Sequence, residues 1–517
     1  MIWPIMKGSI CNSKLVGGLL LALVLLSSIA FAHTKLVRSH PRAKSTLKQA
    51  PKTVDLWFSQ ELQPGFNTIV VTDQTGKRVD RGDVIVSEGG AKAQISLGEL
   101  SSGRYTVDWK VLSADQHTIR GKFTFTIALP QLAAPTEPSP PRPGAPDVQK
   151  VEPQEQPQQD SPQPTTAEAA EGVSFSLPLS SARWLSYLAM VTLFGGFAFR
   201  LFILSPAIRR AMGMNAEERS SALALSARRF VLLSWLSIAA LIFAALAGLI
   251  LQASAVFDVS LKQAVSPGLL YQVITKTSYG GAWLLQVGAS GMLALITFRL
   301  GRDDRPALWW GGLIISATLL LAPSLSGHAA ATVKEHRGAI AIDWLHLIAS
   351  GAWVGGLFHL ALTLPPVLIK LEGAQRILVL DCVIPRFTGL AVVSVALIVL
   401  TGIYNSWLHV ESLSALRNTS YGEMLLVKLS LILPMLLLGA VNTFIIRPRV
   451  ARLAETGEDG ITPEHLKLER GFCHSVRAEA LLGIAVLLAA AVLVFLPPAQ
   501  QRQAVNEAKA AINLERE

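Results

Sequence analysis

Long apolar stretches in the C-terminal part of this 517-residue sequence constrain its fold more than any other feature. We count eight, each long enough to cross the hydrocarbon core of a bilayer as a helix, which takes about 20 residues. They lie near residues 180–203, 230–256, 282–299, 307–326, 338–364, 388–408, 424–446 and 478–496. The content of 51% apolar and only 16% charged residues agrees with this interpretation. The sequence therefore predicts an all-α membrane bundle of eight transmembrane helices over residues 177–497.

Basic residues are distributed unequally among the connections between these stretches. The first, third, fifth and seventh connections hold most of them, for example Arg209, Arg302, Lys370 and Arg447. Because basic connections stay in the cytoplasm, this bias predicts an inner-membrane protein whose N-terminal part and polar tail, residues 498–517, lie outside the cytoplasm. The net charge of +10 then reflects topology. No cluster of basic and aromatic residues indicates nucleic acid as a partner.

The N-terminus has the order of a secretory signal peptide. Lys7 and Lys14 precede an apolar core, and Ala30-Phe31-Ala32 provides the small residues of a cleavage site. An uncleaved anchor helix is the competing interpretation, since the apolar run is close to the minimum for a span. We expect residues 1–32 to be removed, which makes His33 the first residue of the mature chain.

Residues 33–129 have the texture of a small all-β domain. Short segments rich in β-branched and aromatic residues, such as 54–58 and 104–109, alternate with turn signals such as Asp73-Gln74-Thr75-Gly76. This pattern predicts a β-sandwich or barrel. Residues 130–176 are rich in Pro, Gln and Glu and cannot bury a core, so we expect an extended linker there.

Residues of the β-domain offer nitrogen and oxygen donors for a metal. A terminal His33 presents its α-amine and its imidazole together, and Asp115 and His117 share a face if they lie in a strand or at its edge. Such donors suit a tetragonal Cu(II) site. No Met or Cys occurs between His33 and Phe175, so the domain has no evident Cu(I) thioether site. The equally simple alternative is that His33 is a flexible terminus and His117 a surface residue.

With these residues in view, the N-terminal domain resembles CopC, a family of periplasmic copper-binding proteins with an Ig-like β-fold. The resemblance is carried by the cleavage site directly before His33, by the segment 39–43 and by LSADQHTIRGKFTFTI. It implies Cu(II) ligation by His33 and His117, with Asp115 as a further ligand. The Met-rich second site of some CopC proteins has no counterpart here.

The membrane part is similar to CopD, the membrane partner of CopC. The similar segments are SGHAA at 326–330, DWLHLIASGAWVGGL at 343–357, RFTGLAV at 386–392, TGIYNSW at 401–407, TSYGEMLLVK at 419–428 and VRAE at 476–479. Their order and number identify the whole chain as resembling a CopC–CopD fusion.

Polar residues within the spans suggest a second copper site. His328 is expected at the outer end of the fourth span, and Asp343 and His346 lie one helical turn apart in the fifth. A carboxylate inside a span usually faces the bundle interior, a partner or an ion route. We therefore predict a membrane copper site at His328, Asp343 and His346. The alternative is that Asp343 only holds His346 by a hydrogen bond and locks the bundle.

Other candidates in the spans receive a structural interpretation. We expect His359 to serve packing, because it is thirteen residues beyond His346 and on a different helix face. Lys428 can extend to the membrane interface. Four scattered methionines could form a route for Cu(I), but they more simply serve packing: Met190, Met292, Met424 and Met435.

The sequence thus predicts a copper-binding membrane protein that captures Cu(II) outside the inner membrane and passes copper into or across it. Its predicted partners are the copper ion, the lipid bilayer, and other periplasmic copper carriers or a membrane cuproprotein. We expect no catalytic residue and no enzyme activity, and no ATP-binding loop is present. Two alternatives remain: a copper-brace oxidase in the β-domain, and a haem-binding electron carrier in the bundle.

Overall fold

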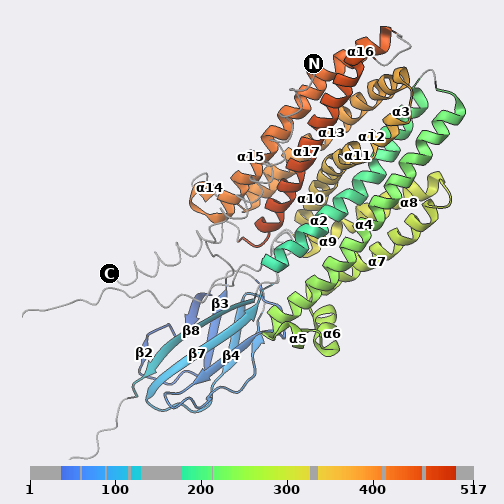
Figure 1. Ribbon diagram of the computed structural model, residues 1–517. Helices are drawn as coiled ribbons and strands as arrows, with labels where there is room; N and C mark the ends of the chain where they lie inside the picture. The colour runs from blue at the N-terminus through green and yellow to red at the C-terminus, as the bar shows by residue number, and fades with distance from the viewer. Residues whose placement is uncertain are drawn as a thin grey trace, which may run out of the picture. The chain divides into compact units, whose positions relative to one another are not determined.

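The computed structural model describes residues 36–58, 61–87, 90–113, 118–129, 177–211, 214–326, 336–409, 415–456 and 462–496 (Figure 1). Within them the chain forms two compact units, a β-domain and a helical bundle. Four residues of the predicted sites fall outside the described residues: His33, Asp115, His117 and His328.

The described part of the β-domain contains two four-stranded sheets, which confirms the predicted sandwich. The first has the order β1-β3-β6-β5 and the second β2-β8-β7-β4. The strands are β1 (Leu36–His40), β2 (Thr46–Leu47), β3 (Thr53–Phe58), β4 (Thr68–Thr72), β5 (Ile85–Val86), β6 (Lys92–Ser96), β7 (Gly103–Leu112) and β8 (Thr118–Ile127). Strand β2 pairs with β8 in parallel, whereas β3 pairs with β1 and β6 antiparallel.

The core of the sandwich follows from the alternation in these strands, because every second side chain of a strand faces the same side. Ile69 and Val71 of β4 and Val107 of β7 are fully buried. The Trp109 indole lies so close to Gly121 of β8 that a Cβ atom there would come within 2.4 Å of the ring. Glycine at 121 therefore gives the indole its place in the core.

Asp80 fastens the segment after β4. Its carboxylate accepts hydrogen bonds from the Arg78 guanidinium at 2.7 Å, from the Val71 amide at 2.8 Å and from the Gly82 amide at 3.0 Å. Burial raises the pKa of Asp80, but the hydrogen bonds from Arg78 and the two amides outweigh burial and lower the pKa below its ordinary value. The charged form of Asp80 therefore stabilises the folded domain.

The pairing register shows that β1 begins at the same end of the sandwich where β7 ends. Leu36 of β1 pairs with Phe58 at the end of β3, and Thr53 at the start of β3 pairs with Ser96 at the end of β6. From Ser96 only six residues lead to the start of β7. The end of β7 therefore lies at the end of the sandwich where β1 begins.

Eight helical segments of the described residues are long and apolar enough to span a membrane, which confirms the predicted number. They are Leu177–Arg210, Ala216–Phe257, Ser278–Leu300, Pro306–Ser326, Gly338–Ile369, Ala374–Ser406, Ser420–Glu455 and Pro463–Leu493. Their elements are α2 (Leu177–Ala198), η1 (Phe199–Leu204), α3 (Ser205–Arg210), α4 (Ala216–Phe257), α7 (Ser278–Leu300), α8 (Pro306–Leu319), α9 (Leu321–Ser326), α10 (His336–Ser350), η3 (Gly351–Gly355), α11 (Gly356–Leu362), α12 (Leu364–Ile369), α13 (Gly373–His409), α15 (Ser420–Val441), η4 (Asn442–Ile446), α16 (Arg447–Thr456) and α17 (Pro463–Leu493). Three short helices join the spans: α5 (Leu261–Ala264), α6 (Pro267–Lys276) and α14 (Ala415–Asn418).

Several spanning helices begin well before the apolar stretches that predicted them. The second begins at Ala216 rather than near 230, and the eighth at Pro463 rather than near 478. Both starts carry a capping box, formed by Asn215 with Glu218 and by Thr462 with His465. These caps satisfy the first backbone N–H groups, so the helix continues through polar residues that hydropathy alone does not assign to a span.

The first and fifth spans form the centre of the bundle. They are the most buried of the eight, at 72% and 78% of their apolar windows. Their backbones touch, because a Cβ atom on Gly355 would come within 2.0 Å of the Val191 carbonyl oxygen and one on Gly195 within 2.3 Å of the Gly355 backbone. The glycines of the Gly351–Gly356 segment therefore allow the two spans to approach closely.

Candidate functional site

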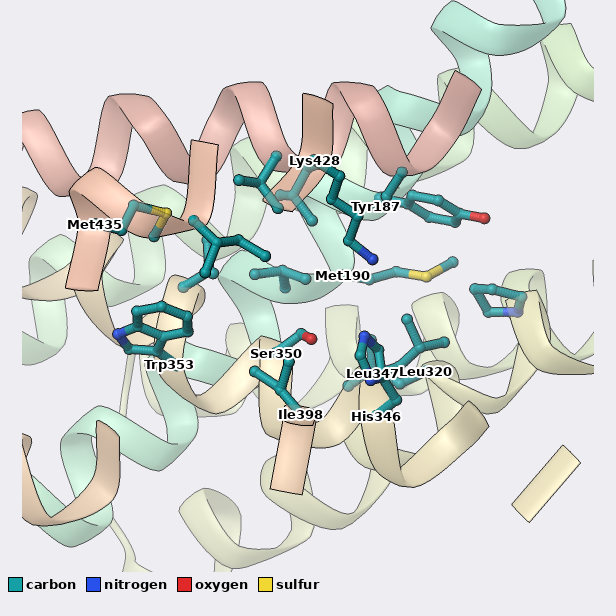
Figure 2. A pocket seen from close by; sticks show the side chains of 17 residues that line it. Tyr187, Met190, Leu320, His346, Leu347, Ser350, Trp353, Ile398, Lys428 and Met435 are labelled. Atoms are coloured by element: carbon teal, nitrogen blue, oxygen red, sulfur yellow. The ribbon is translucent and has the colours of Figure 1, made fainter. Parts of the chain in front are cut away.

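A cavity lies inside the helical bundle, between the first, fourth, fifth, sixth, seventh and eighth spans (Figure 2). Its empty volume, counted together with the open space at its mouth, is about 720 Å³. Most of its wall is apolar. The side chains that give it chemistry are Tyr187, Met190, His346, Ser350, Lys428 and Met435.

His346 is the residue of the predicted membrane site that lines this cavity. Its Nδ1 lies 2.8 Å from the Thr401 Oγ1 of α13, and the Thr401 hydroxyl donates to the Leu397 carbonyl oxygen at 2.6 Å. Because the hydroxyl proton is used in that bond, Thr401 accepts the Nδ1–H of His346. The imidazole therefore has the tautomer in which Nε2 carries the lone pair.

This arrangement prepares His346 for a metal. A ligating histidine usually donates its second ring N–H to a fixed acceptor, which sets both tautomer and ring orientation. The ring also forms a hydrogen bond with the backbone of Ile398 in α13. His346 is thus a half-buried imidazole at the cavity wall, oriented by contacts with α13.

Asp343, one turn before His346, is half-buried and interacts with two neighbours from other spans. Its carboxylate lies beside the Ser324 hydroxyl of α9 and interacts electrostatically with Lys428 of α15. The predicted alternative, a direct hydrogen bond from His346 to Asp343, is absent: the His346 Nδ1 partner is Thr401. Asp343 therefore interacts with Ser324 and Lys428 of other spans and does not hold the ring.

Within the described residues, no group of three or more His, Cys, Asp or Glu side chains is placed to hold a metal ion. The structure thus brings Asp343 and His346 into one region but leaves the predicted trio with His328 untested, because His328 lies outside the described residues. A metal bound in the cavity therefore needs further donors, besides His346, from other residue types.

One residue at the cavity differs from its sequence interpretation: Lys428, expected to extend to the membrane interface, points into the cavity (Figure 2). Met190 and Met435, expected to serve packing, are each 1% exposed, belong to buried hydrophobic clusters and also line the cavity. Lys428 and Met435 are seven residues, or two helical turns, apart, so they lie on one face of α15. This spacing is visible in the sequence, whereas no spacing in the sequence indicates that Met190 faces the same cavity.

The other two methionines of that group behave differently. Met292 is 54% exposed on the surface of α7, so it does not pack inside the bundle. Met424 is half-buried and does not line the cavity, and its packing role stays a prediction.

A second cavity adjoins the first. It lies between the first, second, third and fourth spans, has an empty volume of about 560 Å³, and shares Tyr187, Met190 and Pro323 with the first. Its wall includes Arg183 and Ser326, from the start of α2 and the end of α9. Because these residues lie at the same end of the bundle, we call it the vestibule; Met190 stands between it and the His346 cavity.

His359 has a structural role, as the sequence predicted. Its ring is 1% exposed, its Nδ1 lies 3.1 Å from Thr363 Oγ1, and its Nε2 lies 3.1 Å from the Thr192 carbonyl oxygen. The ring fills the space beside Gly196, where a Cβ atom would come within 2.4 Å of Nε2. With both ring nitrogens paired, His359 has no free donor for a metal.

A further polar pair, Glu479 and Asn442, was missed by the sequence analysis, although Glu479 is the last residue of the VRAE motif. Glu479 of α17 is 2% exposed and accepts a hydrogen bond from Asn442 Nδ2 at 2.6 Å. Asn442 begins the π-helix η4. The pair connects the seventh and eighth spans. Asn442 lies 14 residues beyond Lys428 in the seventh span.

Taken together, an eight-span bundle with an internal cavity and a β-sandwich define a multi-pass membrane protein with an attached β-domain. Residues 36–128 match the family model of the CopC domain, residues 174–336 that of the copper resistance protein D-like N-terminal domain, and residues 382–493 that of copper resistance protein D. The chain belongs to the copper resistance protein C and D families, joined here in one polypeptide. This confirms the predicted CopC–CopD fusion.

Curated relatives support the assignment. Copper transport protein CutJ of Bacillus subtilis (strain 168) is 29% identical over 484 residues, 93% of this chain and 77% of the relative. Copper resistance protein D of Pseudomonas syringae pv. tomato is 32% identical over 219 residues, 42% of this chain and 67% of the relative. Copper resistance protein C of that organism is 35% identical over 111 residues, 20% of this chain and 87% of the relative. Asp343 and His346 lie between the two membrane family matches, so their role is argued from geometry.

Proposed function

We propose that this chain is a copper-handling protein of a bacterial inner membrane, which captures copper on its β-domain and passes it into the His346 cavity. The observation that carries the proposal is the oriented imidazole of His346 at an internal cavity of the bundle. The proposal is supported by the names of the relatives, which are copper transport and copper resistance proteins.

For the β-domain, we assign Cu(II) binding to His33, Asp115 and His117. The register of the sandwich supports this assignment, since the start of β1 and the β7–β8 connection share one end of the domain. Amine, imidazole and carboxylate donors favour Cu(II). The domain has no cysteine or methionine to compete for the ion.

For the bundle, we assign copper to His346, with Asp343 and His328 assisting. Moving a cation into an apolar cavity is costly unless ligands or counter-charges compensate. The carboxylate of Asp343 compensates part of the positive charge that Lys428 already contributes. His328 follows the vestibule residue Ser326 by two positions in the sequence, and we assign it to the transfer of copper inward.

The bias of basic residues supports an orientation with the vestibule, the β-domain and the C-terminal tail outside the cytoplasm. In this orientation the copper ion meets the β-domain first and the vestibule next. Other periplasmic copper carriers deliver the ion, or a membrane cuproprotein receives it.

Copper stoichiometry of the purified full-length chain tests this proposal. We expect each domain to bind copper independently, so that His346→Gln and His117→Ala each remove a different part of the bound metal. His474→Gln is the matched control, because His474 is an exposed histidine of spanning helix α17 away from the cavity. If His346→Gln retains all the copper of the wild type and of His474→Gln, the bundle site is wrong.

A further inference from the structure

We propose that the bundle cavity accepts copper as Cu(I), on a soft ligand set of Met190 and His346 at the entry and Met435 further in. This inference rests on the proposed function that the bundle handles copper. It adds the oxidation state of the ion and assigns two thioether ligands.

The cavity offers soft and borderline donors. Among the described residues that line it are the His346 imidazole and the thioether sulfur atoms of Met190 and Met435, beside the harder groups of Tyr187, Ser350 and Lys428. No carboxylate or thiolate lines the cavity, and the half-buried Cys382 and Cys473 lie elsewhere. Thioether sulfur selects Cu(I), whereas Cu(II) prefers nitrogen and oxygen donors in a tetragonal arrangement.

The apolar wall points to the same ion. The cost of removing an ion from water rises with the square of its charge. A cavity whose described lining residues are mostly apolar and include no carboxylate therefore favours Cu(I) over Cu(II).

The positions of the sulfur atoms define an order. Met190 lines both the vestibule and the His346 cavity, so an ion entering from the vestibule meets Met190 and His346 together. Met435 lies seven residues beyond Lys428 on α15, about 10 Å further along the helix axis. The Met435 methyl group reaches the space beside Gly483 of α17. Met435 is therefore the second thioether of an inward route.

Entry as Cu(I) requires a one-electron reduction of the Cu(II) that the β-domain is proposed to bind. An external thiol balances this step: two Cu(II) ions and two thiols give two Cu(I) ions, one disulfide and two protons. The reduction takes place before the ion enters the bundle.

X-ray absorption at the copper edge tests the inference on the purified full-length chain loaded anaerobically with Cu(I). No methionine or cysteine lies between His33 and Phe175, so copper–sulfur scattering reports on the bundle alone. We expect sulfur scattering in the wild type, its decrease in Met190→Leu, and a loss of Cu(I) affinity of at least about tenfold. Met292→Leu is the matched control, with unchanged scattering and affinity.

Leucine conserves the volume of methionine, so the variants are expected to fold. Met435→Leu is the second variant and should reduce copper release from the cavity while keeping the Met190 signal. Copper bound with nitrogen and oxygen scattering alone, or Met190→Leu and Met435→Leu both behaving as Met292→Leu, overturns the Cu(I) inference and leaves the proposed function standing. A bundle that binds no copper in either oxidation state overturns both.

Discussion

Replacing Thr401 with valine removes the hydroxyl that accepts the Nδ1–H of His346 at 2.8 Å. Valine has nearly the same shape, and Thr401 is only 6% exposed, so the change deletes one acceptor without opening a cavity. The imidazole then loses the contact that fixes its tautomer. We expect copper affinity of the bundle to fall about 10- to 100-fold, which corresponds to about 1.4 to 2.8 kcal/mol.

The matched control is Thr363→Val, which removes the equivalent hydroxyl beside His359. Thr363→Val loses the contact with His359, whereas Thr401→Val loses the contact with His346 and the bond to the Leu397 carbonyl. Each lost hydrogen bond should lower the free energy of unfolding by about 0.5–1.5 kcal/mol. Only Thr401→Val should weaken copper binding. The assay is competition of the purified chain with a chromophoric Cu(I) chelator, with thermal unfolding measured in the same detergent. Equal copper affinity of the two variants would refute the orienting role of Thr401.

Three further predictions concern other parts of the chain. Adding one residue before His33 should abolish high-affinity Cu(II) binding by the β-domain and change its paramagnetic spectrum, whereas His40→Ala should leave both unchanged; native affinity of the extended chain would show that the amine is not a ligand. Gly355→Ala should sharply lower the yield of folded bundle, because its Cβ meets backbone at 2.0 Å, while Gly389→Ala, with open space around it, should not; equal yields would contradict the close packing. Since the pKa of Asp80 is lowered in the folded domain, its contribution to stability is present above the unfolded pKa and is lost as the pH falls through the folded one. The thermal midpoint should therefore fall below about pH 4 in the wild type and less so in Asp80→Asn, and parallel profiles would argue against this role.

The sequence was sufficient for the architecture because hydropathy and alternation are local signals. Each span contains enough apolar residues to identify it alone, and each strand of the β-domain shows its own period of two. The helix starts at Ala216 and Pro463 were not predictable in the same way. They are set by capping boxes in polar sequence, which hydropathy does not detect.

The cavity was only partly predictable because it depends on which helices become neighbours. The face of His346 follows from its own helix. Met190 and Met435 come from the first and seventh spans, and no local pattern indicates that they face one space. The π-helix at Gly351–Gly355 also changes the angular spacing along the fifth span, so a regular helical period does not give the facing of the residues after it.

The interpretation of Lys428 failed for a similar reason. A lysine near the end of an apolar span can extend to the interface, and nothing in its own segment argues otherwise. Its direction into the bundle is favoured by Asp343 of a different span, which balances its charge. Charge pairing between distant segments is a property of the tertiary structure.

Copper uptake into sealed proteoliposomes that contain the purified full-length chain tests the central claim most directly. Copper is supplied outside with a thiol reductant, and the metal trapped inside the vesicles is measured over time. The account predicts uptake by the wild type and by His474→Gln, and none above empty vesicles by His346→Gln. Uptake by His346→Gln at the wild-type rate would contradict the proposal that copper passes through this cavity.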